Sequence, residues 1–189
     1  LFIEECQKRA SYPFYRKLFW GSRKPFFAEA LGNRFSSRTT DWHVIETPGH
    51  AADHVALLHE NNGQLFSGDL YVHPETKVIL RDESISQIIK SIKRLLPYDF
   101  GEMFCCHAGY VKDGKKALHR KLDYLINLQG EILYLAEKGL DEREITSRIF
   151  PKSYPITFFS FGEWNSKHII RSVLQDSFIN LGHETNKKP

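Results

Sequence analysis

Residues 41–107 arrange strands, a turn and a helix in an order that restricts the chain to an α/β fold. The segment "DWHVIET" (41–47) alternates apolar and polar residues, as a half-buried strand does. "HVALLHE" (54–60) and "QLFSGD" (64–69) flank an Asn-Gly turn, an arrangement typical of a β-hairpin. "DESISQIIKSIKRLLP" (82–97) repeats isoleucine and leucine at intervals of three and four, which predicts an amphipathic helix. The order predicts a sheet with a helix packed against it.

Further elements continue this pattern toward the C-terminus. "EMFCCH" (102–107) predicts a short buried strand, and residues 115–138 predict a long helix. Two more helices are predicted over 140–150 and 162–178, with a loop over 150–162 between them, and residues 1–9 have the pattern of a helix end. Strands therefore fill the first half of the chain, with helices between and after them.

The composition of the 189 residues is that of a globular domain. Hydrophobic residues make up 41% and aromatic residues 13%, which is enough for a packed core in a single domain. The net charge is +3, and lysines and arginines never run beyond two in a row, so we expect no nucleic-acid partner. No apolar run approaches the roughly 20 residues of a membrane span, so we expect no membrane association. The three cysteines, an odd number, favour a reducing, cytoplasmic setting.

Three candidate metal ligands stand at the ends of predicted strands. His50 follows the first strand in "TPGHAADH", Asp69 ends the hairpin, and His107 ends the strand "EMFCCH". Strand ends at one edge of an α/β sheet meet in space, so distant residues can build one site there. Imidazole and carboxylate suit zinc, iron or manganese. Taken singly, each of these residues is more often a solvated or turn residue than a ligand.

The segments around these residues resemble a known family. "HVIETPGHAADHVALL" and "GQLFSGDLYV", followed by "FCCHAGYVKDGKKAL", are similar to the second half of the metallo-β-lactamase superfamily, which includes glyoxalase II and related cytosolic hydrolases. The resemblance covers residues 42–128 and implies a four-layer αββα sandwich, of which this chain holds the second half. It further implies that residues 1–139 form the C-terminal part of that domain. Residues 140–189 are then a helical extension packed on it.

The resemblance also implies a dinuclear metal site. His50 corresponds to a ligand of the first metal, Asp69 to the carboxylate that bridges both metals, and His107 to a ligand of the second metal. Two zinc ions are expected in the complete site, with iron or manganese as alternatives. The implied activity is that of a hydrolase in which a metal-activated hydroxide attacks a thioester, ester or similar acyl bond of a small-molecule substrate, with Asp69 as a catalytic residue.

The most diagnostic motif of that family, His-x-His-x-Asp-His, is missing from this sequence. No two of the nine histidines are separated by a single residue. The chain also begins with Leu1 rather than methionine, so we expect it to be the C-terminal portion of a longer protein, inactive alone. A half-sandwich would expose apolar surface, which favours homodimerisation or another association through that face.

Five further polar residues are candidates for supporting or pocket-lining roles. His54 is expected to orient the loop of His50, with Asp53 beside it, and His73 follows Asp69 closely enough to line a pocket. Lys77 and Arg81 would meet an anionic substrate or simply be solvated.

Two other clusters receive structural interpretations. Cys105 and Cys106 are expected to be core thiols. The aromatic cluster of the tail is expected to pack onto the sandwich, with a substrate lid as the alternative; it comprises Phe158, Phe159, Phe161 and Trp164.

Two classes of function remain open besides the acyl hydrolase. The chain is a non-catalytic fragment or pseudoenzyme that acts as an interaction module, or it belongs to an enzyme resembling the sulfur dioxygenases with mononuclear iron. Asp69 stands where true zinc β-lactamases usually carry cysteine. The short stretch between Asp69 and His107 has no room for the domain that nucleic-acid-processing relatives insert there.

Overall fold

The computed structural model describes residues 14–21 and 30–185, and its centre is one mixed β-sheet. The sheet has six strands in the order β1-β2-β3-β4-β6-β7, and a second sheet pairs β5 with β8. The strands are β1 (Arg34–Ser36), β2 (Asp41–Glu46), β3 (Val55–His59), β4 (Leu65–Gly68), β5 (Ile79–Leu80), β6 (Met103–Cys105), β7 (Gly109–Val111) and β8 (Trp164–Asn165). The helices are α2 (Phe14–Trp20), α3 (Ile85–Leu95), α4 (Gly114–Glu137), α5 (Glu142–Ile149), α6 (Pro155–Phe159) and α7 (Lys167–Thr185).

Strand direction brings three loops to one edge of the large sheet. β3 pairs antiparallel with both β2 and β4, so β2 and β4 run the same way. β6 pairs parallel with β4 after the crossover through α3. The C-terminal ends of β2, β4 and β6 therefore lie at the same edge of the sheet, and each end leads into one of the three candidate ligands.

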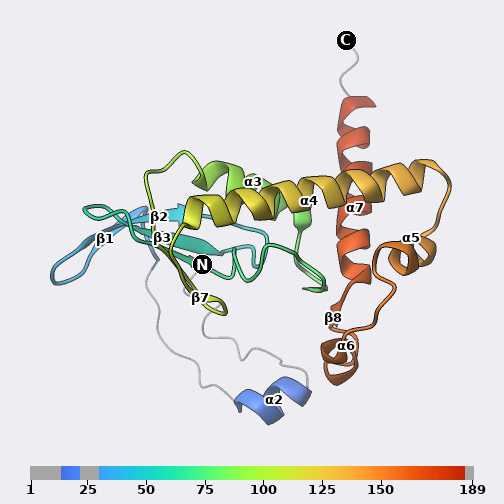
Figure 1. Ribbon diagram of the computed structural model, residues 1–189, viewed down its shortest axis with the longest axis horizontal. Helices are drawn as coiled ribbons and strands as arrows, with labels where there is room; N and C mark the ends of the chain where they lie inside the picture. The colour runs from blue at the N-terminus through green and yellow to red at the C-terminus, as the bar shows by residue number, and fades with distance from the viewer. Residues whose placement is uncertain (1–13, 22–29, 186–189) are drawn as a thin grey trace.

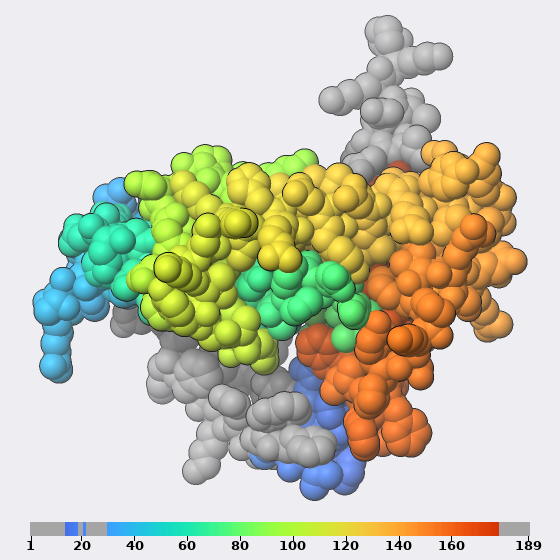
Figure 2. Space-filling view, in the orientation of Figure 1, coloured from blue at the N-terminus to red at the C-terminus, as the bar shows by residue number. Residues whose placement is uncertain are grey.

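Helices α3 and α4 cover one face of this sheet (Figure 1). The buried isoleucines of α3 follow the spacing seen in the sequence, and Ser84 caps the helix by accepting the N–H of Gln87. α7 packs against both α3 and α4, and α5 packs against α7. Figure 2 shows α4 in yellow across the front of the molecule, between the strands and the orange helical tail. Helices α5, α6 and α7 thus follow α4 along the chain, and α7 rests on α3 and α4.

The opposite face of the sheet carries a row of aromatic side chains. Alternation along β4 buries Leu65 on the helix-covered side and turns Phe66 to the other side. Phe66 lies 5.5 Å from the Trp42 ring and 5.1 Å from Phe104, and Phe104 lies 5.5 Å from Tyr110, measured between ring centroids. Phe66 is 42% and Tyr110 53% exposed, so this row offers an apolar surface of the kind expected for the bare face of a half-sandwich.

The structure corrects several local expectations. Cys105 is buried as expected, but Cys106 is exposed, because successive residues at a strand end point to opposite sides. The expectation that the aromatic cluster of the tail packs onto the sandwich is wrong for three of its residues. Phe158, Phe159 and Phe161 are 82%, 63% and 83% exposed. The expected loop 150–162 contains the short helix α6. The helix end expected over residues 1–9 lies outside the described residues.

Several strands were not anticipated from the sequence. They are β1, β5, β7 and β8, of two or three residues each. Segments this short carry too few residues for a readable alternation. Among the residues that the structure describes, no helix is long and apolar enough to cross a membrane.

Candidate metal centre

His50 is held by a turn that packs directly against the start of α3. Gly49 has φ +142°, and a Cβ there would lie 2.7 Å from the backbone nitrogen of Ile88, so a side chain is excluded. Its carbonyl accepts the N–H of Ser84 at 2.9 Å, and Ser91 Oγ donates to the preceding proline carbonyl at 2.6 Å. Helix α3 thereby fixes the backbone that carries His50.

Asp69 is held by the imidazole of His54. The backbone N–H of Asp69 donates to Nε2 of His54 at 3.0 Å, and Nδ1 of His54 lies 2.8 Å from Oγ1 of Thr47. Because Nε2 is the acceptor, the proton of the neutral ring is on Nδ1. Burial lowers the pKa of His54, which favours this neutral form. The loop after β4 is thus tied to the end of β2.

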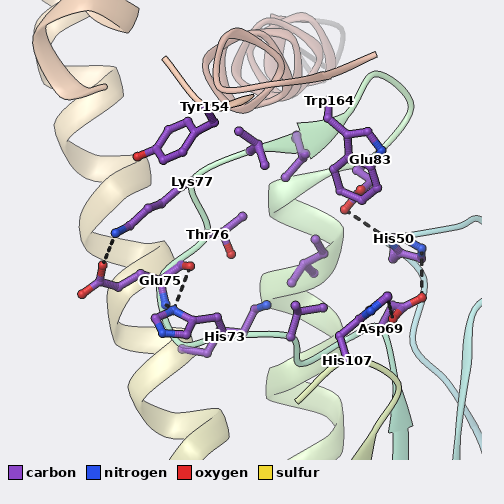
Figure 3. Close-up of a pocket in the computed structure, with 15 residues that line it drawn as sticks. His50, Asp69, His73, Glu75, Thr76, Lys77, Glu83, His107, Tyr154 and Trp164 are labelled. Atoms are coloured by element: carbon purple, nitrogen blue, oxygen red, sulfur yellow. Dashed lines mark hydrogen bonds and ion pairs between the residues drawn. The ribbon is translucent and has the colours of Figure 1, made fainter. Parts of the chain in front are cut away.

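The three candidate ligands meet at Asp69 (Figure 3). Nε2 of His50 lies 3.3 Å from Oδ2 of Asp69, and Nε2 of His107 lies 3.2 Å from Oδ1. Each carboxylate oxygen therefore faces a different imidazole. Asp69 Oδ1 is buried and has no hydrogen-bond partner among the described residues, although His107 is close, because no N–H of suitable direction points at it. A buried carboxylate oxygen in this condition is suited to facing a cation.

Glu83 completes the polar cluster and was not anticipated from the sequence. Its side chain is buried, with Oε2 3.3 Å from Nδ1 of His50 and Oε1 accepting the N–H of Leu80 at 3.0 Å. The contact with Glu83 raises the pKa of His50. The Glu83 carboxylate holds Nδ1 of His50, so Nε2 of the ring is directed at Asp69. Histidines that bind metals are usually held in the same way, with the second ring nitrogen bonded to a carboxylate. The signal available was an acidic residue directly before α3.

The cluster opens into a cavity of about 520 Å³. His50, Asp69, His107 and Glu83 gather at one end of it (Figure 3). The remaining walls are mostly apolar or aromatic, with two lysines; they comprise Val72, His73, Glu75, Thr76, Lys77, Val78, Ile79, Ile88, Lys121, Tyr154 and Trp164. A cavity of this size with a polar end suits a small molecule.

Comparison with solved structures decides the fold. The metallo-β-lactamase family protein TTHA1429 from Thermus thermophilus superposes on 82% of this chain with a TM-score of 0.59 and 19% sequence identity, over 50% of that protein. This chain has the metallo-β-lactamase fold. The fold expected from the sequence is therefore confirmed.

Sequence comparison agrees with this assignment, although no family model matches the chain. A Bacillus subtilis (strain 168) protein named "Probable metallo-hydrolase YqjP" is 26% identical over 128 residues, which cover 62% of this chain and 40% of that protein. A Drosophila melanogaster "Beta-lactamase-like protein 2 homolog" is 31% identical over 98 residues, covering 52% of this chain and 31% of that protein. The resemblance to the metallo-β-lactamase superfamily is confirmed, and the chain spans less than half the length of these curated relatives.

We asked whether His50, Asp69 and His107 are placed so that they could bind two metal ions. Among the described residues, no three His, Cys, Asp or Glu side chains are placed to hold a single ion. A carboxylate shared between two cations requires a different arrangement, with one oxygen and one imidazole for each cation. That is the arrangement of His50, Asp69 and His107. These residues would supply two of the four ligands that each tetrahedral metal takes.

The other residues that the sequence suggested for the site either line this cavity or lie outside it. His73 and Lys77 line the cavity, at the end away from Asp69 (Figure 3), and Lys77 pairs with Glu75 at 3.2 Å. Asp53 is exposed and does not line it. Arg81 lines a different, smaller cavity together with Phe161.

Proposed function

We propose that this chain provides half of a dinuclear metal site in a hydrolase that acts on a thioester, ester or similar acyl bond. The observation that carries the proposal is Asp69, whose two oxygens each face a separate imidazole at 3.2–3.3 Å. Metal ions at such a site supply an acidified water and an electrophile that polarises a carbonyl. The metallo-hydrolase name of the Bacillus subtilis relative is consistent with this class.

The chain's own residues have defined tasks in this proposal. Glu83 orients His50 through Nδ1, and His54 holds the backbone of Asp69, so the two ligands keep their directions. The cavity walls hold the apolar part of a substrate and displace water from it. Both tasks are performed by groups fixed to α3 and to strand ends, which suits a site that must be preorganised.

The remaining ligands are proposed to come from residues outside this sequence. Three protein ligands shared by two metals leave both under-coordinated, and such a site binds metal weakly. We therefore expect the 189-residue chain alone to hold little zinc and to show little hydrolytic activity. The complete site would need a partner segment that carries a cluster such as His-x-His-x-Asp-His.

The test compares the 189-residue chain with an extended form that includes any residues encoded before Leu1. Metal content after loading with zinc, manganese or iron(II), together with hydrolysis of thioester and ester substrates, is measured for both forms. The extended form should bind close to two metals and hydrolyse an acyl bond, and Asp69→Asn should abolish both properties. Asp53→Asn, an exposed carboxylate in the neighbouring loop, is the matched control and should change neither. An extended form that is metal-loaded but unaffected by Asp69→Asn would overturn the proposal.

One observation favours a second candidate, an interaction module without catalysis. The aromatic row on the outer face of the sheet includes Phe66 and Tyr110, which stay about half exposed. Exposed apolar rows of this kind mark protein interfaces. If the preceding coding sequence lacks histidine and aspartate clusters, and no metal binds, this second function is supported instead.

A further inference from the structure

A buried lysine lines the proposed active-site cavity without a direct ion-pair partner among the described residues. Lys121 lies on α4, is 5% exposed and contributes to the cavity wall together with His50 and Asp69. No carboxylate of the described residues lies within 4 Å of its ammonium group. Charged groups this deeply buried are normally paired, because leaving water is costly.

The other lysine of the cavity, Lys77, is more exposed than Lys121 and already has a carboxylate partner. Lys77 is about half exposed, and its ammonium group is 3.2 Å from Oε2 of Glu75. Figure 3 shows this pair at the end of the cavity away from Asp69. An anion entering the cavity would have to break the pair to use Lys77, whereas Lys121 needs no such exchange.

The neighbours of Lys121 do not account for its position by packing alone. Its ammonium group lies 5.9 Å from the centre of the Tyr71 ring, a cation–π contact that compensates only part of the loss of hydration. Methionine or leucine would fill the same space against Tyr71 without any charge to bury. The carboxylates of Glu83 and Asp69 stabilise this charge only from beyond ion-pair distance. An anion inside the cavity would give the ammonium group a direct partner.

We propose that Lys121 is a substrate-binding residue that holds the anionic group of a small organic acid derivative. The substrate class is a carboxylate-bearing ester or thioester whose apolar body rests against walls such as Ile79 and Trp164, with the acyl bond at Asp69. The inference rests on the proposed hydrolase function for the bond that is cleaved. The anion site itself does not depend on metal.

The test uses the 189-residue chain in the presence of EDTA, so that no metal can bind the probe. Dissociation constants of 2-naphthoate and of its neutral isostere 2-naphthamide are measured by calorimetry at pH 7. Lys121→Met should weaken naphthoate binding by about tenfold and leave naphthamide within about twofold of wild type. Lys121→Arg, which keeps the charge, should retain most of the naphthoate affinity.

Lys116→Met is the matched control, since it removes an exposed cation from the same helix. It should change naphthoate binding by less than about twofold, because Lys116 does not line the cavity. Naphthoate binding that is unchanged in Lys121→Met, or absent from the wild-type chain at millimolar probe, overturns the proposal. If Lys121→Met does not fold, Lys121→Gln serves the same comparison. Failure of zinc binding in the extended form would overturn the hydrolase function and leave this result standing.

Discussion

Nε2 of His54 accepts the backbone N–H of Asp69 at 3.0 Å, which joins the residue before β3 to the residue after β4. The other ring nitrogen lies 2.8 Å from Oγ1 and 3.1 Å from the carbonyl of Thr47. His54 therefore does not approach the site as a ligand: both of its nitrogens are engaged by the protein. It fixes the backbone from which the Asp69 carboxylate extends, and its contacts with Thr47 and Ala51 also close the loop that carries His50.

Replacing His54 with leucine should weaken metal binding without removing a ligand. The Asp69 N–H would lose its acceptor, and loss of such a supporting contact typically costs roughly 10- to 100-fold in metal affinity. The measurement is a zinc competition titration on the extended form. His119→Leu, an exposed histidine on α4, should leave the affinity unchanged. Equal affinities for the two variants would contradict the positioning role of His54.

Gly68→Ala should disturb the hydrogen bond between His54 and Asp69 by displacing the His54 ring. Gly68 has φ +53°, and a Cβ at this position would lie 2.6 Å from Nε2 of His54. The strained backbone and the displaced ring together should lower the free energy of unfolding by about 1–3 kcal/mol. Chemical denaturation measures this change. Gly101→Ala is the control, because a Cβ there meets nothing within 4 Å, and a loss as large as that of Gly68→Ala would refute the explanation.

The sequence predicted that His50, Asp69 and His107 lie together, because strand direction is encoded locally. Alternation and the Asn-Gly turn give β2, β3 and β4, and the helix after Asp69 requires a crossover that makes β6 parallel to β4. Three strand ends at one edge follow from these elements. The aromatic row could not be predicted, because it depends on which face the helices cover.

Glu83 and Lys121 were not found in the sequence for a related reason. Neither stands at a strand end or in a recognisable motif. Packing of α3 and α4 on the sheet brings their side chains to the cavity, and the acidic residue before α3 was the one local sign of this placement. Each resembles an ordinary solvated charge until its burial is known.

Because Lys121 is buried, the free energy of unfolding should change with pH in the alkaline range. Burial lowers the pKa of Lys121 to about 8, from 10.5 when unfolded. Between these values the unfolded chain binds the extra proton, so the free energy of unfolding rises with pH there. Lys121→Met should be more stable than wild type at pH 7, and the difference should narrow by roughly 2 kcal/mol by pH 10. Denaturation of both proteins at each pH measures it, and a constant difference would contradict the buried charge.

The aromatic face should drive self-association of the 189-residue chain. Phe66→Glu places a charge in the centre of the row, where Phe66 is 42% exposed, so the fold should tolerate it. Light scattering after size exclusion should show concentration-dependent association in wild type and a shift toward monomer in the variant. Ile126→Glu on α4 is the matched control, since Ile126 is 40% exposed. A wild-type chain that stays monomeric at all concentrations would contradict this expectation.

His168 should make the tail sensitive to acid. Its ring is 2% exposed, Nε2 lies 3.0 Å from the carbonyl of Gly162, and Nδ1 has no hydrogen-bond partner among the described residues. Burial lowers the pKa of His168 below 6.5, so the unfolded chain binds the proton first as pH falls. Its contribution to stability is therefore complete above about pH 6.5 and is lost at lower pH. His168→Gln, which keeps a donor for Gly162, should show a smaller loss of unfolding free energy between pH 8 and 5 than wild type. Exposed His119→Gln should follow wild type, and identical pH profiles for all three proteins would show that His168 is not the group responsible.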